Sequence, residues 1–165
     1  MPATYEPIAT TTLGSATASI TFSSIPTTYT DLRISLVGSL SGGGNYGNLR
    51  FNSDSGSNYS VTILRGNGTT ASSARQTGAT EILYQWTATS SSSDLVFHDI
   101  NIFSYAGNTF KTVLFANSQD ANGSGSVERN VGLWRSTATI TSVNLISSST
   151  WNTGTTATLY GILKA

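Results

Sequence analysis

The amino-acid sequence predicts an all-β fold, an antiparallel two-sheet β-sandwich of jelly-roll type with about nine or ten strands. Apolar residues recur at every second position along nearly the whole chain, which is the spacing of half-buried strands. Residues that favour strands and turns dominate, with 26 Thr, 26 Ser, 12 Asn and 16 Gly among 165 residues. No ten-residue helical pattern occurs. An immunoglobulin-like strand order is the alternative arrangement.

The individual strands follow from this alternation. Leu32, Ile34 and Leu36, for example, share one face, and polar residues separate them. Gly, Ser, Asn and Asp gather between the strands and predict loops, whereas residues 72–76 are expected to form one helical turn at most. We expect strands at residues 18–22, 32–36, 49–51, 59–63, 82–86, 95–105, 113–115, 143–145 and 159–163.

The segment 95–105 differs from the others because both of its faces are apolar. A strand that is apolar on both faces is typical of the centre of a sheet that is covered on both sides. We therefore expect a central, doubly covered strand here. The residues of one face are Leu95, Phe97 and Phe103, and those of the other are Val96, Ile100 and Ile102.

The length suits one domain, because 165 residues can bury a single core and are short for two. We expect one sandwich domain over residues 1–165, including a short extended N-terminal arm at about residues 1–9. This arm contains Pro2, Tyr5, Pro7 and Ile8, a composition that favours an extended chain.

Charge and cysteine content exclude several classes of function. Lys and Arg number 8, Asp and Glu also number 8, and no strong field exists to attract nucleic acid or an anionic membrane. The chain has no cysteine, which excludes a disulfide framework and thiolate metal sites. The apolar runs are too short for a signal peptide or a membrane span, so we expect synthesis as a soluble protein in a cytoplasm.

Three patterns resemble sites of catalysis or cofactor binding. Gly42, Gly44 and Gly47 match the spacing of a dinucleotide-binding loop, but a strand-like alternation follows where that motif needs a helix. His98 is the single histidine, and we expect a structural, hydrogen-bonded residue with Asp99 on the opposite face of its strand. The spacing of the acidic residues selects no catalytic pair. The sequence therefore predicts a protein that is not an enzyme and holds no cofactor. The alternative is an enzyme in which two carboxylates face each other in a cleft.

An oxygen-rich loop carries Asn52, Asp54 and Asn58 at alternating positions. Such a loop can bind calcium, and the same residues also stabilise ordinary turns. Because the loop offers one carboxylate and lacks the glycine and terminal glutamate of an EF-hand, a turn is the favoured interpretation and calcium is the alternative.

The three tryptophans are candidates for a sugar-stacking platform. Trp86 continues the face of Ile82 and Tyr84 and is expected in the core. Trp134 breaks a local alternation and Trp151 follows a Ser/Thr-rich run, so these two are expected to be exposed. For both, ligand binding competes with packing or a subunit interface.

Short motifs spread over most of the chain carry a resemblance to a known group of proteins. The motifs are Tyr5-Glu6-Pro7-Ile8, Ile20-Thr21-Phe22-Ser23-Ser24-Ile25-Pro26, Leu49-Arg50-Phe51-Asn52, Gly56-Ser57-Asn58-Tyr59-Ser60 and Leu159-Tyr160-Gly161-Ile162. They resemble a group of small virion proteins of tailed bacteriophages, many from aquatic and cyanobacterial phages. The resemblance implies a non-enzymatic structural protein on the outer surface of the phage particle, made in the host cytoplasm. Either a capsid decoration (cement) protein or a module of a tail or head fibre is implied.

For a decoration protein, the resemblance implies the major capsid protein and other copies of this chain as partners. A homotrimer is favoured by analogy and capsid geometry, and a dimer is the next choice. Tyr5, Pro7 and Ile8 are the expected capsid or subunit contacts, and a frayed terminus is the alternative. For a fibre module, the expected partner is a host surface glycan, bound through Trp134 or Trp151.

Overall fold

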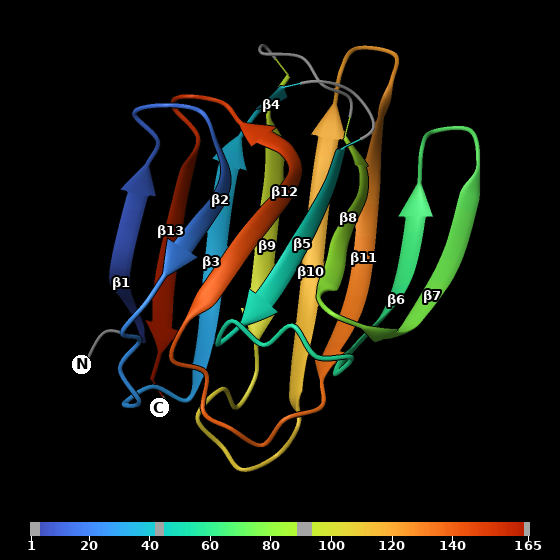
Figure 1. Cartoon of the computed structure of the whole chain (residues 1–165). Helices are drawn as coiled ribbons and strands as arrows, with labels where there is room; N and C mark the ends of the chain where they lie inside the picture. The colour runs from blue at the N-terminus through green and yellow to red at the C-terminus, as the bar shows by residue number, and fades with distance from the viewer. Residues whose placement is uncertain (1–3, 42–44, 89–93, 164–165) are drawn as a thin grey trace.

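The computed structural model describes residues 4–41, 45–88 and 94–163, which form two antiparallel sheets packed face to face (Figure 1). The predicted all-β sandwich is confirmed. The described residues contain thirteen strands: β1 (Tyr5–Thr12), β2 (Thr17–Phe22), β3 (Asp31–Gly38), β4 (Leu40–Ser41), β5 (Asn45–Phe51), β6 (Tyr59–Gly66), β7 (Ala71–Ala79), β8 (Ile82–Ala88), β9 (Val96–Ile102), β10 (Lys111–Asp120), β11 (Gly125–Trp134), β12 (Val143–Trp151) and β13 (Thr156–Ile162).

The strand order of the two sheets agrees with the predicted jelly roll. The large sheet runs β1-β13-β3-β9-β10-β11-β6-β7, and the small sheet runs β2-β12-β5-β8 with β4 beside β12. The chain alternates between the sheets, so that β1, β13, β3 and β9 face β2, β12, β5 and β8. Two facing four-stranded sheets connected in this way are the jelly-roll arrangement.

Two hairpins, β6–β7 and β10–β11, widen the large sheet beyond the jelly roll. Their strands lie side by side next to β9 in the order β10-β11-β6-β7 (Figure 1). The tip of the first hairpin is closed by Asn67, whose Oδ1 accepts hydrogen bonds from the backbone N–H groups of Thr69 and Thr70. We call strands β10, β11, β6 and β7 the extension.

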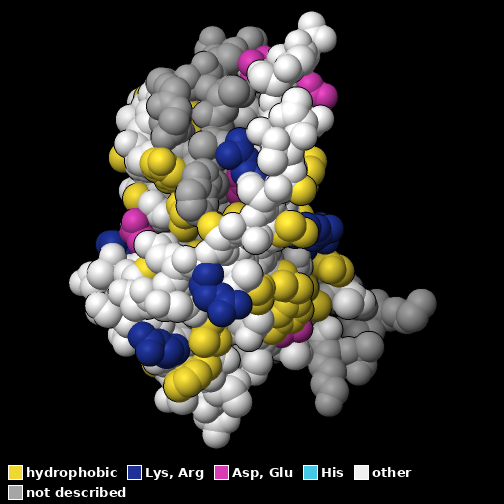
Figure 2. Space-filling model, turned by 90° about the vertical axis from the view of Figure 1, so that its right-hand side faces the viewer, with side chains coloured by type: hydrophobic (Ala, Val, Ile, Leu, Met, Phe, Trp, Pro, Cys, Tyr) yellow, Lys and Arg dark blue, Asp and Glu magenta, His cyan; other side chains and the backbone are white. Residues whose placement is uncertain are grey.

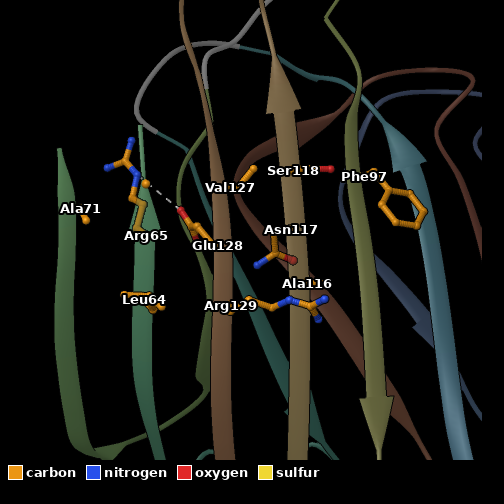
Figure 3. Close-up of a pocket in the computed structure, with 11 residues that line it drawn as sticks. Leu64, Arg65, Ala71, Phe97, Ala116, Asn117, Ser118, Val127, Glu128 and Arg129 are labelled. Carbon is orange, nitrogen blue, oxygen red and sulfur yellow. Dashed lines mark ion pairs between the residues drawn. The ribbon is translucent and has the colours of Figure 1, made fainter. Parts of the chain in front are cut away.

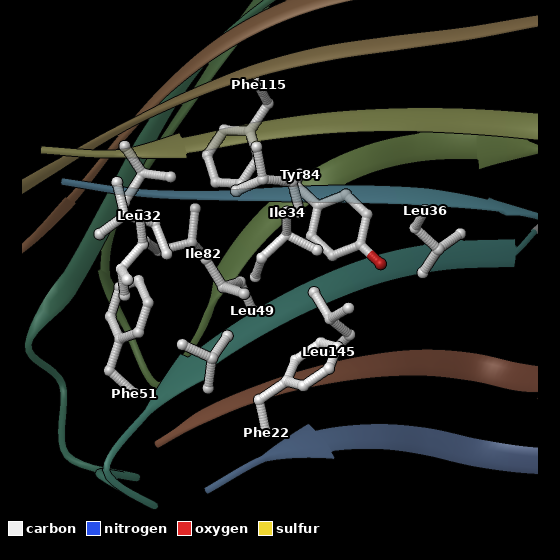
Figure 4. Close-up of a cluster of buried hydrophobic side chains, with 14 of the residues drawn as sticks. Phe22, Leu32, Ile34, Leu36, Leu49, Phe51, Ile82, Tyr84, Phe115 and Leu145 are labelled. Carbon is white, nitrogen blue, oxygen red and sulfur yellow. The ribbon is translucent and has the colours of Figure 1, made fainter. Parts of the chain in front are cut away.

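The core lies between the two sheets, where the inward side chains of the alternating strands meet (Figure 4). Each of these side chains is almost completely buried, which explains why the period-2 pattern located most of the strands. Prominent members are Phe22, Leu32, Ile34, Leu36, Leu49, Phe51, Ile82, Tyr84, Phe115 and Leu145.

The sequence prediction missed strands β1, β4 and β11 and gave residues 72–76 the wrong structure. Residues 72–76 lie in β7 and pair with β6, so the expected helical turn is wrong. β7 carries no large apolar residue, and seven of its nine residues are exposed. Its strand structure therefore comes from pairing with β6 and leaves no hydrophobic signature in the sequence.

The segment 95–105 was predicted correctly as central and wrongly as doubly covered. β9 lies fourth in the eight-stranded sheet, between β3 and β10. Its inner face is buried, but on the other side Leu95, Phe97 and Phe103 keep 58%, 39% and 39% of their surface exposed. Nothing in the described chain covers this outer face.

Candidate functional site

The two tryptophans expected at the surface are both buried, so that expectation is wrong. Trp134 is 2% exposed, stacks on Tyr59 with ring centroids 6.2 Å apart, and donates its indole N–H to Asp54 Oδ2 at 2.7 Å. Trp151 is fully buried and meets the His98 ring edge-on at 5.8 Å. Neither ring can stack on a sugar. The side chain of Trp86, expected in the core, lies outside the described residues.

The oxygen-rich loop forms a turn whose carboxylate is occupied by donors of the protein itself. Asp54 accepts hydrogen bonds from the indole of Trp134, from Gly56 N at 2.8 Å and from Asn58 Nδ2 at 2.9 Å. These bonds, led by that of Trp134, hold the pKa of Asp54 below its ordinary value. Asn52 instead accepts from the backbone N–H of Thr141 at 2.8 Å. The loop therefore has the favoured turn structure.

His98 is a buried structural residue, as the sequence predicts. It is fully buried on the inner face of β9, and its Nδ1 lies 2.9 Å from Asn117 Oδ1. Because Asn117 Nδ2 donates to the carbonyl of Tyr84, its Oδ1 must accept, which places the imidazole proton on Nδ1. Burial lowers the pKa of His98 to about 4. Asp99 lies on the opposite face and forms a two-bond ion pair with Arg33.

A polar cluster lies on the inner side of the extension, facing β8. The carbonyl of Tyr84 accepts hydrogen bonds from the side-chain amides of Asn117 and Asn130, the second at 2.6 Å. Glu128, buried beside Asn130, lies 3.7 Å from Arg65 Nε. β8 is the last strand of the small sheet, so this carbonyl gains partners from the facing sheet instead of from a neighbouring strand.

The third glycine of the G-x-G-x-x-G pattern has a packing role. Gly47 lies in β5, where a Cβ atom would come 2.5 Å from Cε2 of the Tyr84 ring. Its small size therefore makes room for a core aromatic side chain. Gly42 and Gly44 lie outside the described residues.

The residues predicted to form an N-terminal arm belong to the sandwich itself from Tyr5 onwards. Tyr5, Pro7 and Ile8 lie in β1, which pairs with β13 at the edge of the large sheet, with a bulge between Pro7 and Ala9. Tyr5 is 48% exposed, and its ring lies 5.8 Å from the Arg33 guanidinium. Residues 1–3 lie outside the described residues. The expected separate arm is thus replaced by an edge strand whose outward residues remain accessible.

The largest unexplained feature is the outer face of the extension. Every second side chain of β10, β11 and β6 points away from the core, and many of these side chains are apolar. Leu64, Leu114, Val127 and Val131 keep between 42% and 63% of their surface exposed. Contiguous exposed apolar surface of this kind marks interaction sites in soluble proteins. The outward residues of the neighbouring strand β9 continue this surface. We call the outward residues of β9, β10, β11 and β6 together the extension face, which thus includes β9 and leaves out β7.

The extension face is shallow and carries one central cation. A depression of about 550 Å³ lies over it, lined by Leu64, Phe97, Ala116, Val127 and Arg129, among others (Figure 3). Figure 3 shows the Arg129 side chain reaching from β11 across β10 beside Ala116. Arg129 is exposed and forms no ion pair with any described residue. Seen from the β6–β7 side, hydrophobic side chains cluster beside basic ones (Figure 2).

The sequence carries one signal for this face. The apolar outer face of residues 95–105 predicts a covered strand, whereas the structure leaves it exposed. The partner residues on β10 and β11, Leu114, Val127 and Val131, gave no separate signal, because exposed and buried apolar residues look alike in a sequence.

Comparisons with known proteins give no family for the chain. A scan against protein-family models, a search of curated proteins and a search of solved structures each found no match. Within residues 4–41, 45–88 and 94–163, no group of three His, Cys, Asp or Glu side chains could hold a metal ion, and no helix is long and apolar enough to cross a membrane. The likeness to phage virion proteins therefore rests on the sequence motifs alone.

Proposed function

We propose that this chain is a non-enzymatic structural protein of a tailed-phage particle, a capsid decoration protein that binds and stabilises the head shell. The observation that carries the proposal is the extension face, a broad apolar surface on one side of a jelly-roll sandwich. Its residues come from four neighbouring strands and form a shallow surface. Such surfaces suit contacts with protein neighbours, whereas small ligands favour deeper, more enclosed pockets.

The chemistry of the described residues supports a structural role. Asp54, His98 and Glu128 are each engaged in contacts between elements of the fold. The two tryptophans offered for glycan binding are buried, so the fibre-module alternative has lost the platform that motivated it.

A second surface fits contact with the shell. Tyr5 and Pro7 are exposed on β1, at the opposite end of the large sheet from the extension. Binding at two separate surfaces lets one copy join a neighbour and the shell at the same time, so that many weak contacts add up over the particle.

The experiment that tests the proposal is immunogold electron microscopy of intact particles, with antibody raised against the purified chain. Label spread over the heads supports decoration. Label confined to tails or fibre tips overturns decoration in favour of the fibre module, and particles without label overturn both. Tyr5→Ala should then lower occupancy on heads, whereas Tyr46→Ala, which removes a similarly exposed tyrosine from β5, should leave occupancy unchanged.

A further inference from the structure

The register of the large sheet arranges the extension face in rows that are centred on β10. Each row crosses β9, β10 and β11, and its middle residue belongs to β10. The three rows are Phe97–Ser118–Val127, Asp99–Ala116–Arg129 and Asn101–Leu114–Val131.

We infer that the extension face is covered by a second copy of this chain. The two copies are related by a two-fold axis that is parallel to β10 and lies midway between the two facing sheets. This inference identifies the neighbour that binds the extension face, the surface that supports the proposed function. It rests on the proposed function only for the claim that the protein lies on a phage particle. The axis stacks β10 on β10 and β9 of each copy on β11 of the other. Two sheets packed in this way keep their strands within about 30° of each other and lie about 10 Å apart.

Charge complementarity favours this occupant. Asp99 and Arg129 lie in the same row, one strand to either side of Ala116, so they are about 10 Å apart in one copy. The two-fold rotation exchanges the positions of Asp99 and Arg129 and places each Arg129 over Asp99 of the other copy. Asp99 already binds Arg33, but a carboxylate has about four acceptor sites and can take a second guanidinium. Arg129 gains the anion that no described residue of its own chain supplies.

The apolar and small residues agree with the same axis. In the row of Phe97, the ring of one copy lies over Val127 of the other, and in the third row Leu114 meets its own equivalent. Ala116 and Ser118 lie on the axis itself, where small side chains let the two sheets approach. An isologous interface needs self-complementarity of this kind.

The size of the face fits a reversible dimer. Three rows of outward residues on the four strands β9, β10, β11 and β6 cover about 400 Å² of flat area at ordinary strand spacing. This area is about half of the roughly 800 Å² per partner of a typical stable interface. We therefore expect dimers that dissociate on dilution.

The first test is sedimentation equilibrium of the purified chain from micromolar to millimolar concentration, with three proteins compared. Wild-type protein should show a monomer–dimer equilibrium. Arg129→Glu should weaken dimerisation at least about tenfold, because it places two carboxylates against each other. Arg135→Glu is the matched control, since it makes the same charge change at an exposed arginine beyond the end of β11, and it should dimerise like wild type. Thermal melting of all three proteins checks that the fold is retained.

The second test locates the axis by single cysteines, which are unique because the chain has none of its own. Ala116→Cys and Ser118→Cys place a thiol on the axis and should be joined by a short bis-maleimide into covalent dimers. Ser73→Cys lies in the row of Ala116 but three strands away on β7, so its two thiols would be about 29 Å apart. It should stay monomeric under the same treatment.

The outcomes separate this inference from the proposed function. Three outcomes would each overturn the two-fold pairing. They are a chain that stays monomeric at millimolar concentration, a trimer, and a dimer that Arg129→Glu does not weaken and in which Ala116→Cys is not cross-linked. None of these results depends on where the protein lies on a particle. Conversely, immunogold label on tails would overturn decoration and leave the dimer intact.

Discussion

The two halves of the large sheet differ in polarity, because the extension carries buried polar residues on its inner side and exposed apolar residues on its outer side. In the jelly-roll half, the inner residues of β3 are the fully buried Leu32, Ile34 and Leu36, and the outer side pairs polar residues, as in the hydrogen bond between Thr10 and Thr158. In the extension, Asn117, Glu128 and Asn130 point inward beside apolar neighbours, and Leu64, Leu114 and Val131 point outward. Both halves belong to one continuous sheet.

The difference shows that the polarity of a strand follows what covers each of its sides. The inner side of the extension faces β8, the edge of the small sheet, whose Tyr84 carbonyl needs hydrogen-bond donors. The outer side of the extension has no cover within the described chain, and its apolar residues fit a partner. In the jelly-roll half, the small sheet covers the inside with apolar side chains, and the outside carries paired hydroxyl side chains.

The largest expected effect tests whether the inner side of β11 is core while its outer side is not. Trp134→Ala should destabilise the protein by about 3–5 kcal/mol, because it opens a cavity beside Phe51 and Tyr59 and leaves Asp54 without its indole donor. Val131→Ala, on the outer side of the same strand, should cost less than about 1 kcal/mol. Urea unfolding of dilute protein measures both. Similar losses for the two variants would contradict the comparison.

The next effect concerns pH and the buried imidazole. Since the folded-state pKa of His98 is about 4, below its ordinary 6.5, the unfolded chain binds a proton between these values and the folded chain does not. His98 therefore makes stability fall as pH drops from about 6.5 to about 4, by about 3 kcal/mol in all. Urea unfolding at pH 7 and pH 4.5 measures the loss, and His98→Gln should flatten this part of the profile. A profile unchanged by His98→Gln would show that the imidazole titrates freely.

A smaller effect is expected from the two amides that hold the Tyr84 carbonyl. Asn117→Leu and Asn130→Leu should each cost about 1–3 kcal/mol, because each removes a buried hydrogen bond to this carbonyl. Asn117→Leu should cost the more, since it also removes the acceptor of the His98 Nδ1–H. The double variant should lose more than the sum, since only then is the carbonyl left without a donor. A double-mutant cycle from urea unfolding measures the coupling, and additive losses would mean that the two bonds are independent.

The smallest effect is expected for the outer side chains of both halves. Leu114→Thr on the extension and Thr158→Val on β13 should each change the stability of dilute protein by no more than about 0.5 kcal/mol. They should nevertheless differ in binding of the hydrophobic dye ANS, which Leu114→Thr should reduce and Thr158→Val should not. Equal dye binding by wild type and Leu114→Thr would argue that the extension face is not an accessible apolar surface.

The sequence predicted those parts of the protein that repeat a local pattern. Period-2 alternation located the jelly-roll strands other than β1, with core residues such as Ile34 and Leu145, because one buried face imposes the pattern on these strands. β1 has no buried residue and was missed. The turn compositions at 66–68 and 122–126 mark the tips of the two hairpins. His98 was recognised as structural because a single histidine without partners has little catalytic use.

Only the tertiary structure decided what covers each face. Trp134 and Trp151 lie next to loop-like sequence, yet they are buried because segments distant in sequence pack over them, such as the Asp54 loop beside Trp134. Phe97 looks like a core residue and is exposed because none of the described residues forms a third layer over β9. Burial depends on contacts between residues far apart in the chain, so alternation shows that a side chain lies on one face and cannot show whether that face is covered. The polarity of the extension, and with it the candidate interface, follows from this long-range arrangement.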